Sequence, residues 1–333
     1  MSKTGMRWDA ATVNNITVED LDKESFDIFR REALRSGRMT SQDLEIPNAE
    51  LLDKLDLMID GKLKRAGALC FYRNAEKVIS GCYVKIGKFE GSELLYQDEV
   101  HGSLLLMADR VIDLIYLKYL KAAVSYYKET RVETYPFARD AVREAFYNAL
   151  IHCNWADNNP IQIRIDDDEM FIGNSCLLPF DWSAETLMSS HTSRPLNPDI
   201  ARVFYRAGYI ENWGRGIQKI CDACKKIGAD APEYIVHSED IMVKFIALER
   251  AKVTEKVTEK VTEKVTEKQN DIEQKIIDIL KQVPDMTYVE LSRKLNVSRK
   301  TVSQKIRGLK EKGIVVRIGS DKKGYWKIID SDR

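Results

Sequence analysis

The sequence predicts a mixed α/β chain, of the α+β kind, made of a larger body and a small C-terminal domain. Two observations carry this prediction. Strand-like and helix-like hydrophobic patterns alternate through residues 60–249. Closely spaced helical patterns followed by a hairpin pattern occupy residues 271–329, beyond a low-complexity repeat.

The composition is that of a globular chain. For 333 residues about two or three domains are expected, and 44% apolar residues are enough to form real cores. No run of 18 apolar residues occurs and the first ten residues hold no hydrophobic signal core, which argues against a membrane span and against secretion. The six cysteines lie mostly inside apolar runs, as expected of reduced thiols in a cytoplasmic protein.

Four copies of the tetrapeptide VTEK occupy residues 253–268. In a helix this period stacks like charges four residues apart, and half of the residues are β-branched, which lowers helix propensity. In a strand it leaves no apolar face to bury. The repeat therefore predicts a solvated, charge-balanced linker over residues 251–269, while ordering as a helix or pairing with a partner chain stays open.

The charge is distributed unevenly along the chain. The whole sequence has 52 basic and 52 acidic residues, so its net charge is zero. Residues 271–333 nevertheless contain 15 Lys and Arg against 9 Asp and Glu, a net charge of +6. Between Arg293 and Lys327 there are 12 basic residues and 2 acidic ones, a density that attracts a polyanion.

The pattern after the repeat is that of a helix-turn-helix followed by a hairpin. One helix is predicted within residues 271–282, a second at residues 288–295, and a third with Ser298 as its N-cap. The segment IVVRIGSDKKGYWKII then alternates like two strands with a loop at residues 319–324. Over residues 270–333 the chain resembles the winged helix-turn-helix family of bacterial regulators, which implies DNA binding.

The third helix of this domain carries the residues expected to contact DNA. Its apolar residues are expected to face inward, so its polar residues would enter the major groove. The predicted DNA-binding residues are Arg299, Lys300, Thr301, Ser303, Gln304, Arg307, Lys322 and Lys323. Arg and Gln reach base edges, whereas the lysines, Lys305 among them, suit phosphates. The alternative is a winged helix used for protein contacts, with a solvated basic face.

Cys221 and Cys224 form a single C-x-x-C pair. No second pair exists and the nearest downstream histidine is His237, so four zinc ligands cannot be assembled locally. The pair lies on the apolar side of the helix pattern GIQKICDACKKIG. Core packing is therefore the preferred interpretation.

Three segments between residues 135 and 249 carry candidate binding residues. PFARDAVREAFYNALIHCNW predicts a helix with Glu144 and Asn148 one turn apart on the same face. IQIRIDDDEMFIGNS predicts two strands joined by an acidic turn. Gly214 and Gly216 form a Gly-x-Gly that opens another helix, where backbone N–H groups can hold a phosphate.

Together these segments resemble the ATP-binding domain of the GHKL group, to which gyrase, chaperone, histidine kinase and mismatch-repair ATPases belong. They resemble more closely a divergent branch in bacterial proteins described as RecG-like helicase C-terminal domains or transcriptional regulators. The residues that carry this resemblance are REAFYNALIH, IGNSCLLP and FYRAGYIENWGRGI. A tether rich in Val and Thr commonly joins this domain to a winged helix, and the same order is found here.

The GHKL resemblance implies ATP with Mg²⁺ as the cofactor and assigns roles to five residues. Glu144 would orient the attacking water, and Asn148 would bind the Mg²⁺ that bridges the phosphates. Asn174 would stand in the place of the adenine-reading aspartate. Gly214 and Gly216 would line the triphosphate.

The chain departs from the GHKL pattern at two places. Asn174 offers an amide where the ATPases use an acid, and Cys176-Leu177 replaces a glycine. No Walker A motif and no ordered set of helicase motifs occurs in the sequence. The alternative interpretation is that Glu144 and Asn148 are ordinary surface residues of a helix, and that the glycines only cap or turn the chain.

Residues 1–125 predict a further α/β region. DGKLKRAGALCFYRN is typical of a helix or strand pair, VISGCYVKIGKFEG of a strand, and residues 104–127 of one long amphipathic helix. The pattern resembles the latter half of the Schlafen/AlbA-like domain that precedes the ATPase-like domain in the same regulators. Its basic residues, which form either a second nucleic-acid surface or a solvated face, are Lys62, Lys64, Arg65, Lys85 and Lys88.

We therefore expect a partial Schlafen/AlbA-like region (1–125), a GHKL-like α/β sandwich (126–250), a linker (251–269) and a winged helix (270–333). Together they predict a DNA-binding transcriptional regulator with a nucleotide-sensing body. The alternatives are an ATP-dependent enzyme acting on nucleic acid and a protein-interaction scaffold. Double-stranded DNA is the expected partner, and a homodimer is expected because a single winged helix binds weakly. A flexible linker spanning on the order of 20 to 25 Å would let paired domains reach adjacent half-sites.

Overall fold

The computed structural model describes residues 7–127, 130–179, 181–189, 192–211, 214–248, 273–295, 297–319 and 324–329. The chain divides into two compact units, residues 1–125 with 131–250 and residues 126–130 with 251–333. Both mix helices and strands, which confirms the predicted fold class. The predicted linker at residues 251–269 lies outside the described residues.

The first unit, here called the body, begins with short elements that precede its main sheet. They are α1 (Lys23–Arg35), α2 (Ser41–Leu44), α3 (Asn48–Lys54), β1 (Met58–Ile59), β2 (Lys62–Leu63) and α4 (Arg65–Phe71). The N-cap of α1 is Asp22, whose carboxylate accepts a hydrogen bond from the backbone N–H of Ser25 at 2.9 Å. A capping carboxylate of this kind satisfies an N–H group that the helix itself leaves unpaired.

A six-stranded mixed sheet forms the frame of the body, in the order β4-β3-β7-β8-β10-β9. Its strands are β3 (Val84–Glu90), β4 (Glu93–Val100), β7 (Ile161–Ile165), β8 (Glu169–Ser175), β9 (Glu233–Val236) and β10 (Asp240–Ile246). β3 and β7 pair in parallel, and the other neighbours are antiparallel. The sheet thus crosses the predicted boundary at residues 125 and 126, and that boundary stays a prediction.

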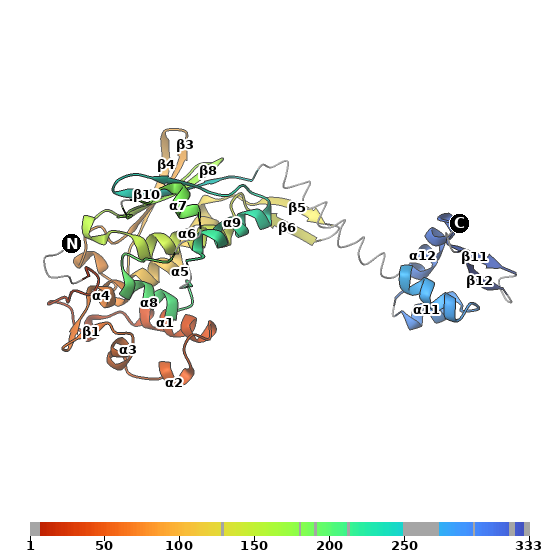
Figure 1. Cartoon of the computed structure of the whole chain (residues 1–333), viewed down its shortest axis with the longest axis horizontal. Helices are drawn as coiled ribbons and strands as arrows, with labels where there is room; N and C mark the ends of the chain where they lie inside the picture. The colour runs from red at the N-terminus through yellow and green to blue at the C-terminus, as the bar shows by residue number, and fades with distance from the viewer. Residues whose placement is uncertain are drawn as a thin grey trace. The chain divides into compact units, whose positions relative to one another are not determined.

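Helices cover one face of this sheet (Figure 1). They are α5 (Leu104–Leu114), α6 (Arg139–His152), α7 (Ala184–Met188) and α9 (Gly216–Ile227), whereas α8 (Pro198–Arg206) packs against α6 and α4. In β7 the alternate residues Ile161, Ile163 and Ile165 are buried, whereas Gln162 is exposed. Alternation of this kind belongs to a strand with one covered face.

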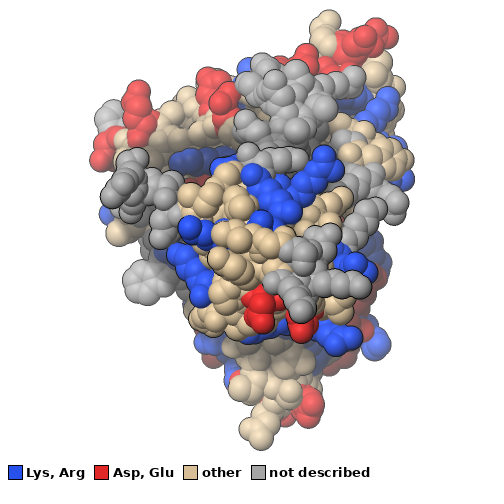
Figure 2. Space-filling model, turned by 90° about the vertical axis from the view of Figure 1, so that its right-hand side faces the viewer, with Lys and Arg blue, Asp and Glu red and all other residues tan. Residues whose placement is uncertain are grey.

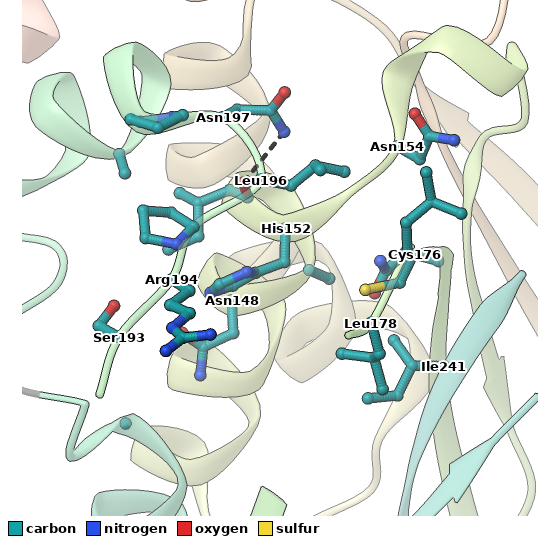
Figure 3. Close-up of a pocket in the computed structure, with 18 of the residues that line it drawn as sticks. Asn148, His152, Asn154, Cys176, Leu178, Ser193, Arg194, Leu196, Asn197 and Ile241 are labelled. Atoms are coloured by element: carbon teal, nitrogen blue, oxygen red, sulfur yellow. Dashed lines mark hydrogen bonds between the residues drawn. The ribbon is translucent and has the colours of Figure 1, made fainter. Parts of the chain in front are cut away.

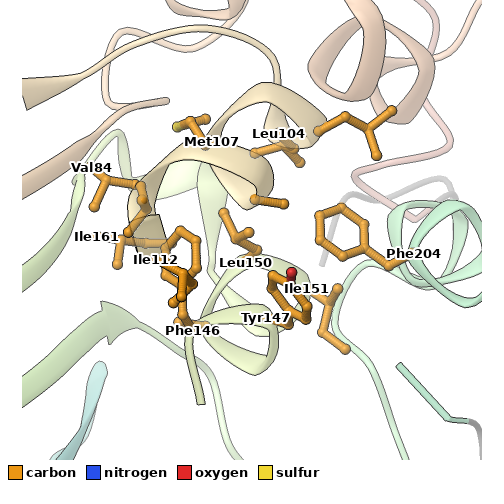
Figure 4. Packing of buried hydrophobic residues seen from close by; sticks show 14 of the residues in the cluster. Val84, Leu104, Met107, Ile112, Phe146, Tyr147, Leu150, Ile151, Ile161 and Phe204 are labelled. Atoms are coloured by element: carbon orange, nitrogen blue, oxygen red, sulfur yellow. The ribbon is translucent and has the colours of Figure 1, made fainter. Parts of the chain in front are cut away.

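The core of the body lies between α5, α6 and the sheet. Figure 4 shows Phe146 and Leu150 of α6 close to Ile112 of α5 and to Val84 and Ile161 of the sheet. All five side chains are at most 4% exposed. Each fully buried side chain of this size stabilises the fold by about 1.5 to 3 kcal/mol relative to its exposed state.

The long helix predicted at residues 104–127 is wrong in its second half. The observed elements are α5, a π-helical turn at Ile115–Tyr119, and the paired strands β5 (Ala123–Tyr127) and β6 (Thr130–Thr134). Tyr119 is the last residue of the helical part, and its hydroxyl lies 2.9 Å from the carbonyl oxygen of Ile86 in β3 and 2.6 Å from Oδ2 of Asp98. The segment that follows is rich in Val and Tyr, which favour strands.

The second unit has the element order that the sequence predicts. It contains a helix at residues 273–282, α11 (Tyr288–Lys294), α12 (Arg299–Glu311), β11 (Val315–Ile318) and β12 (Tyr325–Ile328). Ser298 is the N-cap of α12, as predicted, and its hydroxyl accepts a hydrogen bond from the N–H of Thr301 at 3.1 Å. The buried core of this unit consists of Ile276, Leu280, Leu291, Val302, Ile306, Leu309, Val315 and Trp326.

None of the helices in the described part of the chain combines the length and the apolar character that crossing a bilayer requires.

Candidate functional site

The body encloses a cavity of about 1060 Å³ between the sheet and the helices α6 and α9. Its walls come from α6, β8, β10, the start of α9 and the segment that runs from Leu177 to Pro198. Figure 3 shows Asn148, His152 and Arg194 on one side and Cys176, Leu178 and Ile241 on the other. Ligand pockets usually measure about 300 to 1,000 Å³, so this cavity has room for a nucleotide.

α6 and α9 bring Glu144, Asn148 and Gly216 together on one wall of this cavity. A Cβ atom built on Gly216 would lie 3.0 Å from Oε1 of Glu144 and 3.0 Å from Nδ2 of Asn148. Gly216 is also the first residue of α9, where backbone N–H groups have no partner within the helix. A carboxyl group and an amide on one turn of α6 thus meet the N-terminus of α9, which lies far away in the sequence.

The two glycines of the Gly-x-Gly serve different structural needs. Gly214 has a φ of +67°, a left-handed conformation that glycine adopts without strain. Gly216 has ordinary helical geometry, and its lack of a side chain leaves room for Glu144 and Asn148 opposite. Gly208, by contrast, turns the chain at a φ of +82° against Ser36 and does not line the cavity.

Glu144 is a buried acid with only 8% of its surface exposed. Burial raises its pKa above the ordinary value, while the charges of Lys219 and Arg143 act in the opposite direction. Lys219 is itself ion-paired with Glu211 at 2.9 Å. The interpretation of Glu144 as an ordinary surface residue is therefore wrong, and a carboxyl with a raised pKa is suited to proton transfer.

Asn174 and Cys176 occupy the wall formed by β8 and the segment after it. Asn174 is 7% exposed, and its Nδ2 donates a hydrogen bond to the carbonyl oxygen of Ser175 at 2.9 Å. In this orientation its Oδ1 is the atom left to accept a hydrogen bond, as an aspartate would. Cys176 is 5% exposed and lines the cavity, and burial raises the pKa of its thiol to about 11.

The outer side of α12 carries most of the predicted DNA-binding residues. Arg299, Ser303, Gln304 and Arg307 are exposed, opposite the buried residues of the same helix. Thr301 is half-buried, with its hydroxyl 2.8 Å from that of Ser298. The side chain of Lys300, and Lys322 and Lys323 entirely, lie outside the described residues. Figure 2 shows Lys and Arg side chains on the face turned to the viewer, interspersed with uncharged and some acidic residues.

Several basic residues of the second unit serve its structure instead. Lys305, which the sequence pattern also suited to phosphates, is ion-paired with Glu273 at 3.0 Å, and Lys312 binds the same carboxylate at 2.8 Å. Arg317 lies 4.7 Å from the ring centre of Trp326. Part of the positive charge of this unit therefore holds its helices and hairpin together.

The basic residues of the first region do not form one nucleic-acid surface. Lys64 is 4% exposed and pairs with Asp56 at 3.0 Å and with Asp199 at 3.3 Å. Lys88 pairs with Asp167 at 2.6 Å, and Arg65 lines the cavity. Two of these partners, Asp199 and Asp167, come from distant segments, so the local sequence did not reveal them.

The C-x-x-C pair packs on the inner side of α9. Cys224 is 2% exposed, beside the fully buried Ile220. Cys221 is half-buried at the edge of the same face. This placement agrees with the interpretation of the pair as core residues.

Two family models match parts of the chain. Residues 158–245 match the family described as "Putative ATP-dependent DNA helicase recG C-terminal". Residues 269–316 match the family described as "Winged helix-turn-helix DNA-binding". The first match spans β7 to β10 and includes Asn174, Gly214 and Gly216, whereas Glu144 and Asn148 lie before it.

A crystal structure of the DIP2311 protein from Corynebacterium diphtheriae shares the fold, with a TM-score of 0.62 at 19% sequence identity. The alignment covers 97% of this chain and 64% of that one, so this chain spans about two thirds of the length of that protein. No curated protein gives a significant match. The chain thus combines a domain of the RecG C-terminal family with a winged helix-turn-helix domain.

Proposed function

We propose that this protein is a DNA-binding regulator whose body binds a nucleoside triphosphate, with ATP and Mg²⁺ as the ligand. The observation that supports this most strongly is the meeting of Glu144, Asn148 and Gly216 on one wall of the cavity. These are the groups that the GHKL resemblance assigns to the water, the metal and the triphosphate. They come from two helices that are separated in the sequence, and the packing of α9 against α6 brings them together.

The residues around the cavity fit such a ligand in size and in chemistry. Asn148 offers an amide oxygen, and Mg²⁺ is commonly held by one or two protein groups together with phosphate oxygens. Gly216 leaves space where any other side chain would approach Glu144 and Asn148. The bound Mg²⁺ would neutralise phosphate charge. The amide Oδ1 of Asn174 can accept a hydrogen bond from an amino group such as that of adenine.

The second unit supplies the DNA contact in this proposal. Arg299 and Gln304 project from the exposed side of α12 and are able to reach base edges in a major groove. Arg307, nearer the middle of the helix, suits a phosphate or a base. A homodimer would double this contact, and sedimentation of the full chain with and without duplex DNA tests that part of the proposal.

Thermal unfolding of the full chain with ATP and Mg²⁺ tests nucleotide binding directly. We expect ATP to raise the melting temperature of the wild-type body and to have little effect on Asn148→Ala. Asn14→Ala, at an exposed asparagine that does not line the cavity, is the matched control and should respond as the wild type does. Equal responses in all three chains would contradict the proposed site.

The second candidate function is ATP hydrolysis coupled to work on nucleic acid. Burial raises the pKa of Glu144, which favours this function, since a carboxylate with a raised pKa is a stronger base toward an attacking water. Release of phosphate that Glu144→Gln abolishes would support the enzyme. Stabilisation by ATP without phosphate release would support a regulator that only senses the nucleotide.

A further inference from the structure

Residues 193–197, which precede α8, line the cavity, and the last of them is held by hydrogen bonds. Asn197, which is 1% exposed, donates hydrogen bonds from Nδ2 to the carbonyl oxygens of Ile151 at 3.0 Å and Cys153 at 2.8 Å. These carbonyls lie at the C-terminal end of α6, where helices leave acceptors unpaired. Pro198 then begins α8 at a position that suits proline. The segment is thus fixed to the helix that carries Asn148.

Arg194 projects from this segment into the cavity. Its side chain is exposed, lines the cavity, and points toward Asn148 in Figure 3. In the described part of the chain no carboxylate forms an ion pair with it. The other two arginines on the wall are engaged, Arg7 with Asp199 at 3.0 Å and Arg65 over the ring of Trp8 at 4.9 Å.

Two basic side chains near the start of α9 are already engaged. Lys219 and Arg215 both bind Glu211, at 2.9 Å and 3.3 Å. Asn148 and the backbone of Gly216 are neutral. A triphosphate carries several negative charges, and a guanidinium group binds two phosphate oxygens at once in a fixed geometry.

We infer that Arg194 binds the terminal phosphate of the nucleotide, so that the pocket distinguishes a triphosphate from a diphosphate. The position of Arg194 supports the terminal phosphate, because it lies across the cavity from Cys176, Leu178 and Ile241, the side on which the base would sit. Loss of that phosphate would remove the contact and release Arg194. This inference rests on the proposed binding of a nucleotide.

Calorimetric titration of the full chain with ATP, ADP and adenosine tests it. Arg194→Ala should weaken ATP binding by about ten-fold or more and leave ADP and adenosine affinity within about two-fold of wild type, because one charge-assisted phosphate contact is lost. The ATP affinity of Arg194→Lys should lie between those of wild type and Arg194→Ala, because lysine keeps the charge but lacks the forked donors of a guanidinium group. Arg206→Ala, an exposed arginine at the end of α8, is the matched control and should bind ATP as wild type does.

The outcomes separate this inference from the function on which it rests. If wild type binds ATP and Arg194→Ala binds it equally well, the role of Arg194 is wrong and nucleotide binding stands. If the variant loses ATP and ADP affinity to the same extent, Arg194 does not contact the terminal phosphate. If wild type binds neither ATP nor ADP, the proposed function itself fails.

Discussion

The body and the winged helix place their polar chemistry in opposite ways. In the body Glu144, Asn174 and Asn197 are at most 8% exposed and surround a cavity beneath a large core. In the described part of the winged helix a small buried core packs against α12, whose Arg299 and Gln304 face outward. The body thus offers a cavity of a size that suits a small ligand, whereas the second unit presents its polar side chains on an exposed helix.

The largest expected effect comes from Trp326, which tests whether the two units fold independently. It is 3% exposed, and its Nε1 donates a hydrogen bond to the carbonyl oxygen of Met286 at 3.1 Å. Trp326→Ala should destabilise the small unit by about 3 to 5 kcal/mol, enough to unfold it. Circular dichroism should then show loss of the second unit and of DNA binding, with an unchanged melting transition of the body.

Tyr325→Ala is the control for this change, because Tyr325 is 48% exposed on the same strand. It should leave DNA binding within about two-fold of wild type and stability within about 0.5 kcal/mol. A lower melting temperature of the body in Trp326→Ala would contradict independent folding.

Substitution of Asn197 tests how much a buried polar side chain stabilises the body. Asn197→Ala leaves two carbonyl oxygens at the end of α6 without their donor and should lower the free energy of unfolding by about 2 to 3 kcal/mol. Chemical denaturation measures this loss. DNA affinity of the folded chain should not change, and an unaltered denaturation midpoint would show that the segment before α8 is not held by these bonds.

Substitutions of Gly214 and Gly216 test the wall of the cavity, and we expect them to change stability less than Asn197→Ala does. Gly216→Ala places a methyl group 3.0 Å from the side-chain atoms of Glu144 and Asn148, and should lower ATP affinity by about ten-fold with little change in stability. Gly214→Ala should instead lower stability by about 1 kcal/mol, because the φ of +67° strains any other residue. Calorimetry measures the ATP affinity of both variants, and denaturation measures their stability. If the two variants changed affinity and stability in the same way, the separate roles given to the two glycines would be wrong.

The smallest expected effect concerns the pH dependence set by Glu144. Because burial raises its pKa in the folded state, the folded chain binds this proton more tightly than the unfolded chain does, and stability falls as pH rises above the unfolded value of 4.5. Glu144→Gln removes that loss. The variant should match wild type at low pH and become more stable than wild type toward neutral pH, as measured by denaturation across the range.

Asp9, whose pKa burial also raises, contributes in the same direction and is unchanged in the variant. The difference between the two curves therefore reports Glu144 alone. A constant difference at all pH values would mean that the carboxyl does not titrate differently in the folded state.

The winged helix was largely predictable from sequence because its signals are local. Hydrophobic spacing and the cap at Ser298 gave the helices, and the outward positions of α12 followed from the inward ones. The sequence suited Lys305 to a phosphate but did not reveal its ion pair with Glu273, because no local pattern shows how the helix that carries Glu273 packs.

The body was predictable only in part because its site is assembled from distant segments. The sequence indicated Glu144 and Asn148 on one helix face, yet the approach of Gly216 to both depends on the packing of α9 against α6. Arg194 carried no pattern at all, since it precedes α8 in an irregular segment. The helix predicted to reach residue 127 was wrong beyond Tyr119, where the helical part ends and β5 follows.

The most direct test of the account is the affinity of the full chain for a duplex of random sequence, measured by fluorescence anisotropy at fixed salt with and without ATP and Mg²⁺. A regulator that couples the two units should show affinities that differ by at least about five-fold between the two conditions. The difference should vanish in Asn148→Ala. The same DNA affinity in both conditions, in a wild-type chain that calorimetry shows to bind ATP, would contradict the account.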